Sequence, residues 1–146
     1  MQIPSRAARA ARAGFSLAEL MVVIVIIGLL ATLVVPNVVR KLFVANVAKA
    51  KADIVSISEA CDEYAVENQG KYPESLQELV TPDEIGHTYL NRETVPTDPW
   101  GNEYQYEPPG GGNVKPTVTS FGSDGVPGGE GDAKDMTNHQ IRNGEI

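Results

Sequence analysis

The run GFSLAELMVVIVIIGLLATLVV extends from Gly14 to Val35, and Glu19 carries the only strongly polar side chain within it. A helix from Phe15 to Val35 would be about 31 Å long at about 1.5 Å per residue, which matches the hydrocarbon core of a bilayer. We therefore predict a transmembrane helix and assign a transmembrane and assembly segment to residues 15–36.

The residues in front of this run contain three arginines and no acidic residue. A secretory signal peptide has a basic start, an apolar run and then a small-residue cleavage site. Here residues 36–41, directly after the apolar run, contain no A-x-A pattern, whereas the small residue Gly14 lies before the run. Cleavage after Gly14 would remove residues 1–14 as a leader, leave the apolar helix on the mature protein and create a free amine on Phe15.

Glu19 needs a partner if it lies inside a membrane, because a carboxylate there costs about 2.5–3.5 kcal/mol on insertion scales. No cationic side chain lies within a helical turn or two of it. The natural partner is the amine created at Phe15, either on the same chain or on a neighbouring copy. The alternative is that Glu19 lies shallow enough to reach the lipid headgroups.

Beyond Pro36 the pattern becomes amphipathic. Apolar residues recur at spacings of three and four at Val47, Ala50, Ile54, Ile57, Cys61 and Tyr64. This stripe predicts that one helix runs from Phe15 to about Asn68 and holds the C-terminal part of the chain. The stretch from Gly28 to Pro36 is its weakest part, since Pro36 lacks the N–H that would bond the carbonyl of Thr32.

The C-terminal half is rich in turn residues: 12 of the 14 glycines and 8 of the 10 prolines lie after residue 69. The single cysteine, Cys61, excludes an internal disulfide, and its position on the stripe predicts a small buried residue. A folded tail must then rely on packing against the helix, on a metal or on neighbouring subunits. The net charge of −7 argues against a general nucleic-acid-binding role.

Local patterns predict a short helix and a hairpin in this half, and hence the α+β class. Ser75 and Glu78 have capping-box spacing ahead of two apolar residues. A turn at 97–102 leads into a predicted strand at 103–106, and the glycine-rich run at 110–113 connects to a second strand near 117–121.

The segment from Phe121 to Asp135 is glycine-rich and acidic. Its polar side chains include Ser123, Asp124, Glu130, Asp132 and Asp135. Oxygen-only donors on a flexible loop suit Ca²⁺, which takes about six to eight ligands. The spacing differs from that of an EF-hand, and the alternative is a solvated acidic loop.

The junction GFSLAELMVV resembles the class III leader junction of type IV pilins and type II secretion pseudopilins. The resemblance implies that a membrane-embedded prepilin peptidase cuts after Gly14 and methylates the amine of Phe15. It also implies that Glu19 neutralises a neighbouring subunit's amine during assembly. The chain departs from the commonest form of the junction at Ser16 and Ala18, where the family more often has Thr and a larger apolar residue.

Three further motifs lie in the order K-Y-P at 71–73, D-P-W-G-N-x-Y-x-Y at 98–106 and S-F-G-S-D-G-x-x-G-G-E-G-D at 120–132. This order resembles the major pseudopilins of type II secretion more than pilus subunits. The resemblance implies a pilin-like fold, with a long N-terminal helix, a small antiparallel sheet and a calcium-binding end. The implied calcium donors are the Phe121 carbonyl, Asp124, Asp132 and Asp135. It further implies that the stretch from Gly28 to Pro36 melts in the filament.

The function implied by the resemblance is that of a major structural subunit whose polymer drives export of folded proteins across the outer membrane. Its implied partners are copies of itself, minor pseudopilins, an inner-membrane assembly platform and the prepilin peptidase. It would cross the bacterial inner membrane once, with residues 37–146 as a periplasmic domain. The flanking charges leave the orientation ambiguous, so this topology rests on the resemblance.

No nucleophile elbow, phosphate loop or metalloprotease motif is present in the sequence, and we expect a protein that is not an enzyme. Two alternatives remain open. One is a type IV pilus subunit for adhesion or motility, and the other is an uncleaved membrane-anchored binding protein.

Overall fold

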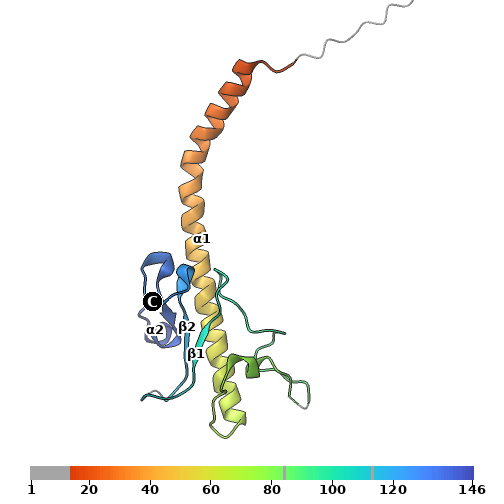
Figure 1. Ribbon diagram of the computed structural model, residues 1–146, viewed down its shortest axis with the longest axis vertical. Helices are drawn as coiled ribbons and strands as arrows, with labels where there is room; N and C mark the ends of the chain where they lie inside the picture. Colours follow the sequence, from red (N-terminus) through yellow and green to blue (C-terminus); the bar gives the residue numbers. More distant parts are fainter. Residues whose placement is uncertain (1–13, 84, 113) are drawn as a thin grey trace, which may run out of the picture. The chain divides into compact units, whose positions relative to one another are not determined.

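The computed structural model describes residues 14–83, 85–112 and 114–146 (Figure 1). The chain divides into two compact units, the first ending at Arg40 and the second running from Lys41 to Ile146. Helix α1, Leu17–Glu67, contributes residues to both units. Its end agrees with the end near Asn68 that the apolar stripe predicts.

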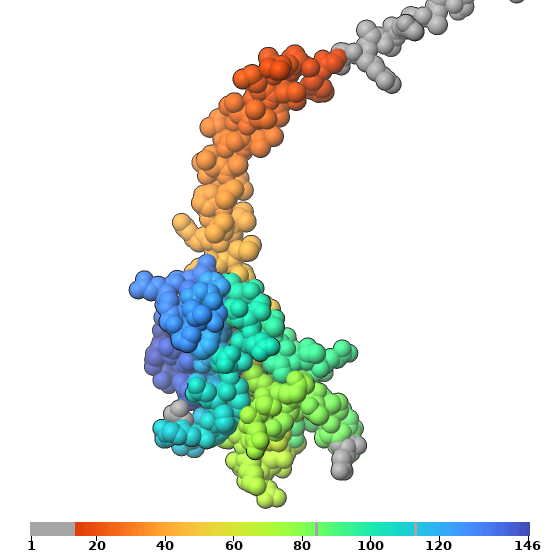
Figure 2. All heavy atoms as spheres, viewed as in Figure 1, coloured from red at the N-terminus to blue at the C-terminus, as the bar shows by residue number. Residues whose placement is uncertain are grey.

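In the first unit, α1 exposes an almost wholly apolar surface. Figure 2 draws the atoms of this part of α1 in red and orange. Every residue of α1 from Leu17 to Arg40 is exposed, for example Ile24 at 64% and Leu33 at 70%. Among the described residues, α1 is the one helix that is long and apolar enough to cross a membrane. The predicted apolar N-terminal helix is therefore confirmed as a helix.

Helix α1 continues through Pro36 without a break. Side chains supply hydrogen bonds in this stretch: Thr32 Oγ1 donates to the carbonyl oxygens of Gly28 at 3.1 Å and Leu29 at 2.7 Å, and Asn37 Nδ2 donates to that of Leu33 at 3.0 Å. These bonds reach the carbonyls of Gly28, Leu29 and Leu33, but not that of Thr32, which loses its helical donor because Pro36 has no N–H. Melting of this stretch in a filament stays a prediction.

The second unit contains a three-stranded antiparallel sheet in the order β1-β2-β3. Its strands are β1 at Gln105–Glu107, β2 at Thr117–Ser120 and β3 at Met136–Thr137. Tyr106 lies opposite Val118, and Ser120 lies opposite Met136. The predicted hairpin and the α+β pilin-like fold are confirmed, although β1 begins two residues later than predicted and β3 was not predicted.

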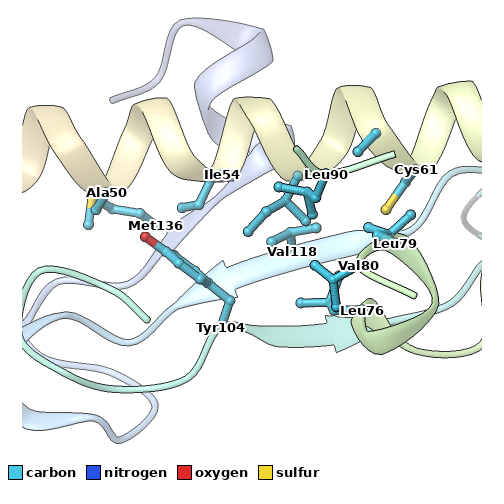
Figure 3. Close-up of a cluster of buried hydrophobic side chains, with 12 residues drawn as sticks. Ala50, Ile54, Cys61, Leu76, Leu79, Val80, Leu90, Tyr104, Val118 and Met136 are labelled. Atoms are coloured by element: carbon cyan, nitrogen blue, oxygen red, sulfur yellow. The ribbon is translucent and has the colours of Figure 1, made fainter. Parts of the chain in front are cut away.

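The core of this unit lies between α1 and the sheet (Figure 3). Ile54, Ile57 and Cys61 of α1 are fully buried there, as is Val118 of β2. Burial, together with the nearby charge of Asp62, raises the pKa of the Cys61 thiol to about 12. Cys61 is thus a free, buried and unreactive residue, as its position on the stripe predicts.

The predicted short helix is a 3₁₀ turn, η1 at Leu76–Leu79, and its predicted capping box is wrong. The Ser75 side chain makes no capping hydrogen bond. The Glu78 carboxylate instead accepts from the Glu74 N–H at 3.1 Å and from the Tyr64 hydroxyl at 2.8 Å. One oxygen of the Glu78 carboxylate is thus used in a tertiary contact with α1, and the other bonds the N–H of Glu74 instead of that of Ser75.

A second α-helix, α2 at Asn138–Asn143, was not predicted. It begins with a capping box: Thr137 Oγ1 accepts from the Gln140 N–H at 3.2 Å, and Gln140 Oε1 accepts from the Thr137 N–H at 3.0 Å. The T-x-x-Q pattern was the available signal. Gly144, with φ of 72°, ends the helix.

Candidate functional site

The predicted cleavage point lies in an open segment. Gly14, Phe15 and Ser16 precede α1 and have no regular structure, and the Phe15 side chain is 83% exposed. A side chain built at Gly14 would meet no described atom within 4 Å. The rest of the predicted leader, residues 1–13, lies outside the described residues. Gly14 and Phe15, the two residues that the predicted cleavage would separate, are therefore exposed and accessible to a protease.

Glu19 has a hydrogen-bonding partner that sequence reasoning overlooked. The Ser16 N–H donates to Glu19 Oε2 at 2.7 Å, and the Glu19 N–H donates to Ser16 Oγ at 3.2 Å. This is a capping box at the start of α1, and the S-x-x-E pattern was its signal. The box satisfies the carboxylate's hydrogen bonding but supplies no positive charge. The amine proposed at Phe15 would be adjacent in sequence to Ser16.

The acidic loop closes on itself through two short 3₁₀ turns, η2 at Gly122–Asp124 and η3 at Gly131–Ala133. A Cβ added to Gly122 would lie 2.5 Å from the Asp132 carbonyl oxygen, and one added to Gly129 would lie 2.5 Å from the Ala133 carbonyl oxygen. Only glycine permits these approaches, since both residues also have positive φ. The fold thus brings Asp124 and Asp132 onto two touching turns.

Asp135 carries the least satisfied polar atom of this loop. Its Oδ2 accepts from the Gly128 N–H at 2.8 Å, whereas its Oδ1 is buried without a hydrogen-bond partner. Asp124 Oδ1 accepts from the Val126 N–H at 3.3 Å, and the side chain of Asp132 is exposed. A buried carboxylate oxygen without a partner is costly unless a water or a cation binds it.

The acidic side chains do not form a metal site on their own. Within residues 14–83, 85–112 and 114–146, no three Asp, Glu, His or Cys side chains gather closely enough to hold a metal ion. A cation at this loop would need main-chain oxygens, such as the Phe121 carbonyl, beside the carboxylates. The calcium assignment therefore stays a prediction.

The turn before β1 is tied to the acidic loop by three residues, Asp98, Asn102 and Ser120, which we call the loop anchor. Asp98 is buried, and its Oδ1 accepts from the N–H groups of Trp100 at 3.1 Å and Asn102 at 2.8 Å. The Ser120 hydroxyl donates to Asp98 Oδ2 at 2.9 Å, and Asn102 Nδ2 donates to the Gly122 carbonyl at 2.8 Å. Sequence reasoning recognised only the turn, because the Ser120–Asp98 and Asn102–Gly122 contacts join residues 22 and 20 positions apart.

A long helix whose N-terminal part is apolar and exposed, and whose C-terminal part packs against a small antiparallel sheet, defines the class of pilin-like subunits. The prokaryotic N-terminal methylation motif matches residues 9–35. The family model of type II secretion system protein G matches residues 37–139, and the chain belongs to this family.

Curated relatives agree with this family along most of the chain. The type II secretion system core protein G of Vibrio cholerae is 42% identical over 141 residues, which cover 88% of this chain and 92% of the relative. The core protein G of Pseudomonas aeruginosa is 39% identical over 141 residues, which cover 89% of this chain and 96% of the relative. The core protein G of Escherichia coli K12 is 43% identical over 129 residues, which cover 82% of this chain and 87% of the relative.

A solved structure shows the same fold. The crystal structure of the major pseudopilin from the type 2 secretion system of enterohaemorrhagic Escherichia coli aligns with a TM-score of 0.51 and 28% sequence identity. The alignment covers 72% of this chain and 92% of the solved chain.

Proposed function

We propose that this chain is the major structural subunit of a type II secretion pseudopilus, whose polymer drives the export of folded proteins across the outer membrane. The observation that carries the proposal is the protein G family match over residues 37–139. The exposed apolar part of α1 supports it, because such a surface requires either lipid or neighbouring copies to cover it. The role is structural and uses no catalytic residue.

The proposed route to assembly starts with cleavage after Gly14 by a prepilin peptidase and methylation of the amine of Phe15. The mature chain is then held in the inner membrane by residues 15–36, with residues 37–146 in the periplasm. Copies of the chain, minor pseudopilins and an inner-membrane assembly platform are the proposed partners. The open backbone around Gly14 and the methylation-motif match support this order of events.

The test is a deletion of the gene, complemented with the wild-type chain. We expect folded exoproteins to accumulate in the periplasm of the deletion strain and to be secreted again on complementation. Normal secretion with loss of surface pili would instead identify a type IV pilus subunit. Mass spectrometry of the mature chain should find methylated Phe15, whereas Met1 would identify an uncleaved anchored protein.

We further propose that the acidic loop binds calcium through the Phe121 carbonyl, Asp124, Asp132 and Asp135. The residues present fit this ion: the donors are all oxygens, the two turns are in contact, and the buried Oδ1 of Asp135 needs a partner. Bound calcium would neutralise the carboxylates and join both ends of the loop. It would stabilise this half of the chain in the place of a disulfide.

A further inference from the structure

Both peptide groups that flank Gly122 are held by the loop anchor. The Gly122 N–H donates to Ser120 Oγ at 3.3 Å, and the Gly122 carbonyl accepts from Asn102 Nδ2 at 2.8 Å. In a planar trans peptide, the carbonyl of Phe121 points opposite to the N–H of Gly122. Ser120 therefore sets the direction of the Phe121 carbonyl, and Asn102 sets the orientation of the next peptide.

The loop anchor is itself firmly held. The Asp98 N–H donates to the Asn102 carbonyl at 2.8 Å, in addition to the bond that Asp98 Oδ1 accepts from the Asn102 N–H. Asp98 is 3% exposed and Ser120 is 0% exposed, so water does not compete for these bonds. The Asn102 amide thus has a fixed backbone from which to reach the loop.

Asn102 contacts both ends of the turn that carries Asp124. A Cβ added to Gly125 would lie 2.9 Å from Asn102 Oδ1, so the amide fits between Gly125 and the carbonyl of Gly122. Gly122 in turn packs against the backbone of Asp132 and Ala133 in η3. The Asn102 side chain therefore supports the turn that carries Asp124, and Gly122 of that turn packs against the Asp132 backbone.

We infer that Asn102, supported by Asp98 and Ser120, is a positioning residue for a divalent cation at the acidic loop. Asn102 holds the peptide after Gly122 and the turn bearing Asp124, while Ser120 directs the Phe121 carbonyl, before the ion arrives, which removes an ordering cost from binding. The inference rests on the proposed calcium site. A purely structural role would change the melting temperature of the metal-free chain without changing its affinity for calcium.

The test compares the full-length chain with its Asn102→Ala and Asn68→Ala variants, purified in detergent and stripped of metal. Asn68 is the matched control, because its Nδ2 also donates to a backbone carbonyl, that of Tyr64 at 2.9 Å, at the far end of α1. Calcium chloride titrated into each protein in a calorimeter gives the dissociation constant. We expect Asn102→Ala to weaken calcium binding about 10- to 100-fold, as loss of residues that orient metal ligands does. We expect Asn68→Ala to leave binding unchanged.

The outcomes separate this inference from the calcium proposal. Wild-type affinity in Asn102→Ala would overturn the positioning role and leave the calcium site standing. Absence of calcium binding by the wild-type chain would overturn the site itself. If Asn102→Ala does not fold, Ser120→Ala is measured instead, since it releases the Gly122 N–H, and an unchanged affinity there would equally overturn the inference. The calcium-induced rise in melting temperature, measured within each variant, gives the second readout.

Discussion

Glu19 is hydrogen-bonded to Ser16, but its negative charge has no positively charged partner among the described residues. The capping box with Ser16 begins α1, and a glutamine at position 19 would preserve it, because either Glu or Gln serves at this position of the box. The two contributions of Glu19 can therefore be separated by substitution.

We predict that Glu19→Gln leaves cleavage after Gly14 intact but abolishes efficient polymerisation, because the glutamine has no charge to pair with a neighbour's amine. Ser16→Ala is the control, since it loses the capping hydroxyl and keeps the carboxylate, and it should still polymerise. Cleavage is measured by mass spectrometry of the N-terminus, and polymers by cross-linking and immunoblotting. Normal filaments from Glu19→Gln would contradict the proposed role of the charge.

Asp62 joins α1 to the segment before β2, because its Oδ2 binds Lys115 Nζ at 2.6 Å while its Oδ1 accepts from the Tyr72 hydroxyl at 2.8 Å. Partial burial raises the pKa of Asp62, but hydrogen bonds from Lys115 and Tyr72 and the charges of Lys115 and Arg142 outweigh burial and leave this pKa lowered. The ionised form thus stabilises the fold above the unfolded-state pKa of about 3.9. That contribution is lost as the pH falls through the lower folded-state pKa.

We predict that Asp62→Asn lowers the melting temperature at pH 7 and that the difference from wild type narrows below about pH 4. The effect should not exceed about 1 kcal/mol, because the Asp62 side chain is 40% exposed. Glu63→Gln, at an exposed position on the same helix, should show no such pH dependence. A difference that stays constant from pH 7 to pH 3 would exclude an electrostatic contribution from Asp62.

At the scale of the helices, the capping-box sequence pattern forms its hydrogen bonds at some helix starts of this chain and not at others. Hydroxyl and carboxylate or amide residues three apart form a capping box at Ser16 and at Thr137, but not at Ser75. At Ser75 the paired acid, Glu78, bonds to Tyr64 of α1. A local pattern predicts a cap only when no tertiary contact competes for the capping side chain, and the sequence does not show that competition.

The attachment of the sheet to α1 depends on the apolar stripe that the sequence predicts. We expect Ile57→Ala to reduce the free energy of unfolding by about 2–5 kcal/mol, because Ile57 is 0% exposed and its loss leaves a cavity. Val66→Ala, at a position 83% exposed on the same helix, should change it by less than about 0.5 kcal/mol. Urea unfolding followed by fluorescence of Trp100, the one tryptophan, provides the measurement. Equal losses in both variants would contradict the assignment of the stripe to the core.

Across the whole molecule, the C-terminal half is loop-rich and has no disulfide, so a bound ion would stabilise much of the second unit. We predict that removing calcium with a chelator lowers the melting temperature of the full-length chain. At a calcium concentration about 100-fold above the dissociation constant, binding contributes about 2.7 kcal/mol, which corresponds to about 10 °C or more for a domain of this size. Magnesium should not restore the loss, because it demands a tighter octahedral site. An unchanged melting curve in excess chelator would count decisively against the site.

Patterns that are local in the chain were readable without the fold. The apolar run after Gly14, the stripe containing Ile54 and Ile57 and the hairpin depend on composition and on periods of two or three to four residues, which neighbouring residues establish among themselves. The family resemblance also rests on short motifs of this kind, and the comparisons confirm it.

The loop anchor, the added strand β3 and the unpartnered oxygen of Asp135 required the folded chain. The Asn102 to Gly122 bond joins residues 20 positions apart, and β3 exists because Met136 pairs with Ser120 after the acidic loop has closed. Such contacts form where burial brings distant segments together and where glycine lets two backbones approach closely. No short-range periodicity in the sequence predicts which distant segments will be in contact. The run that begins at Gly14 is the opposite case, because its helix, its cleavage point and even the Ser16–Glu19 capping box are local and have a signal in neighbouring residues.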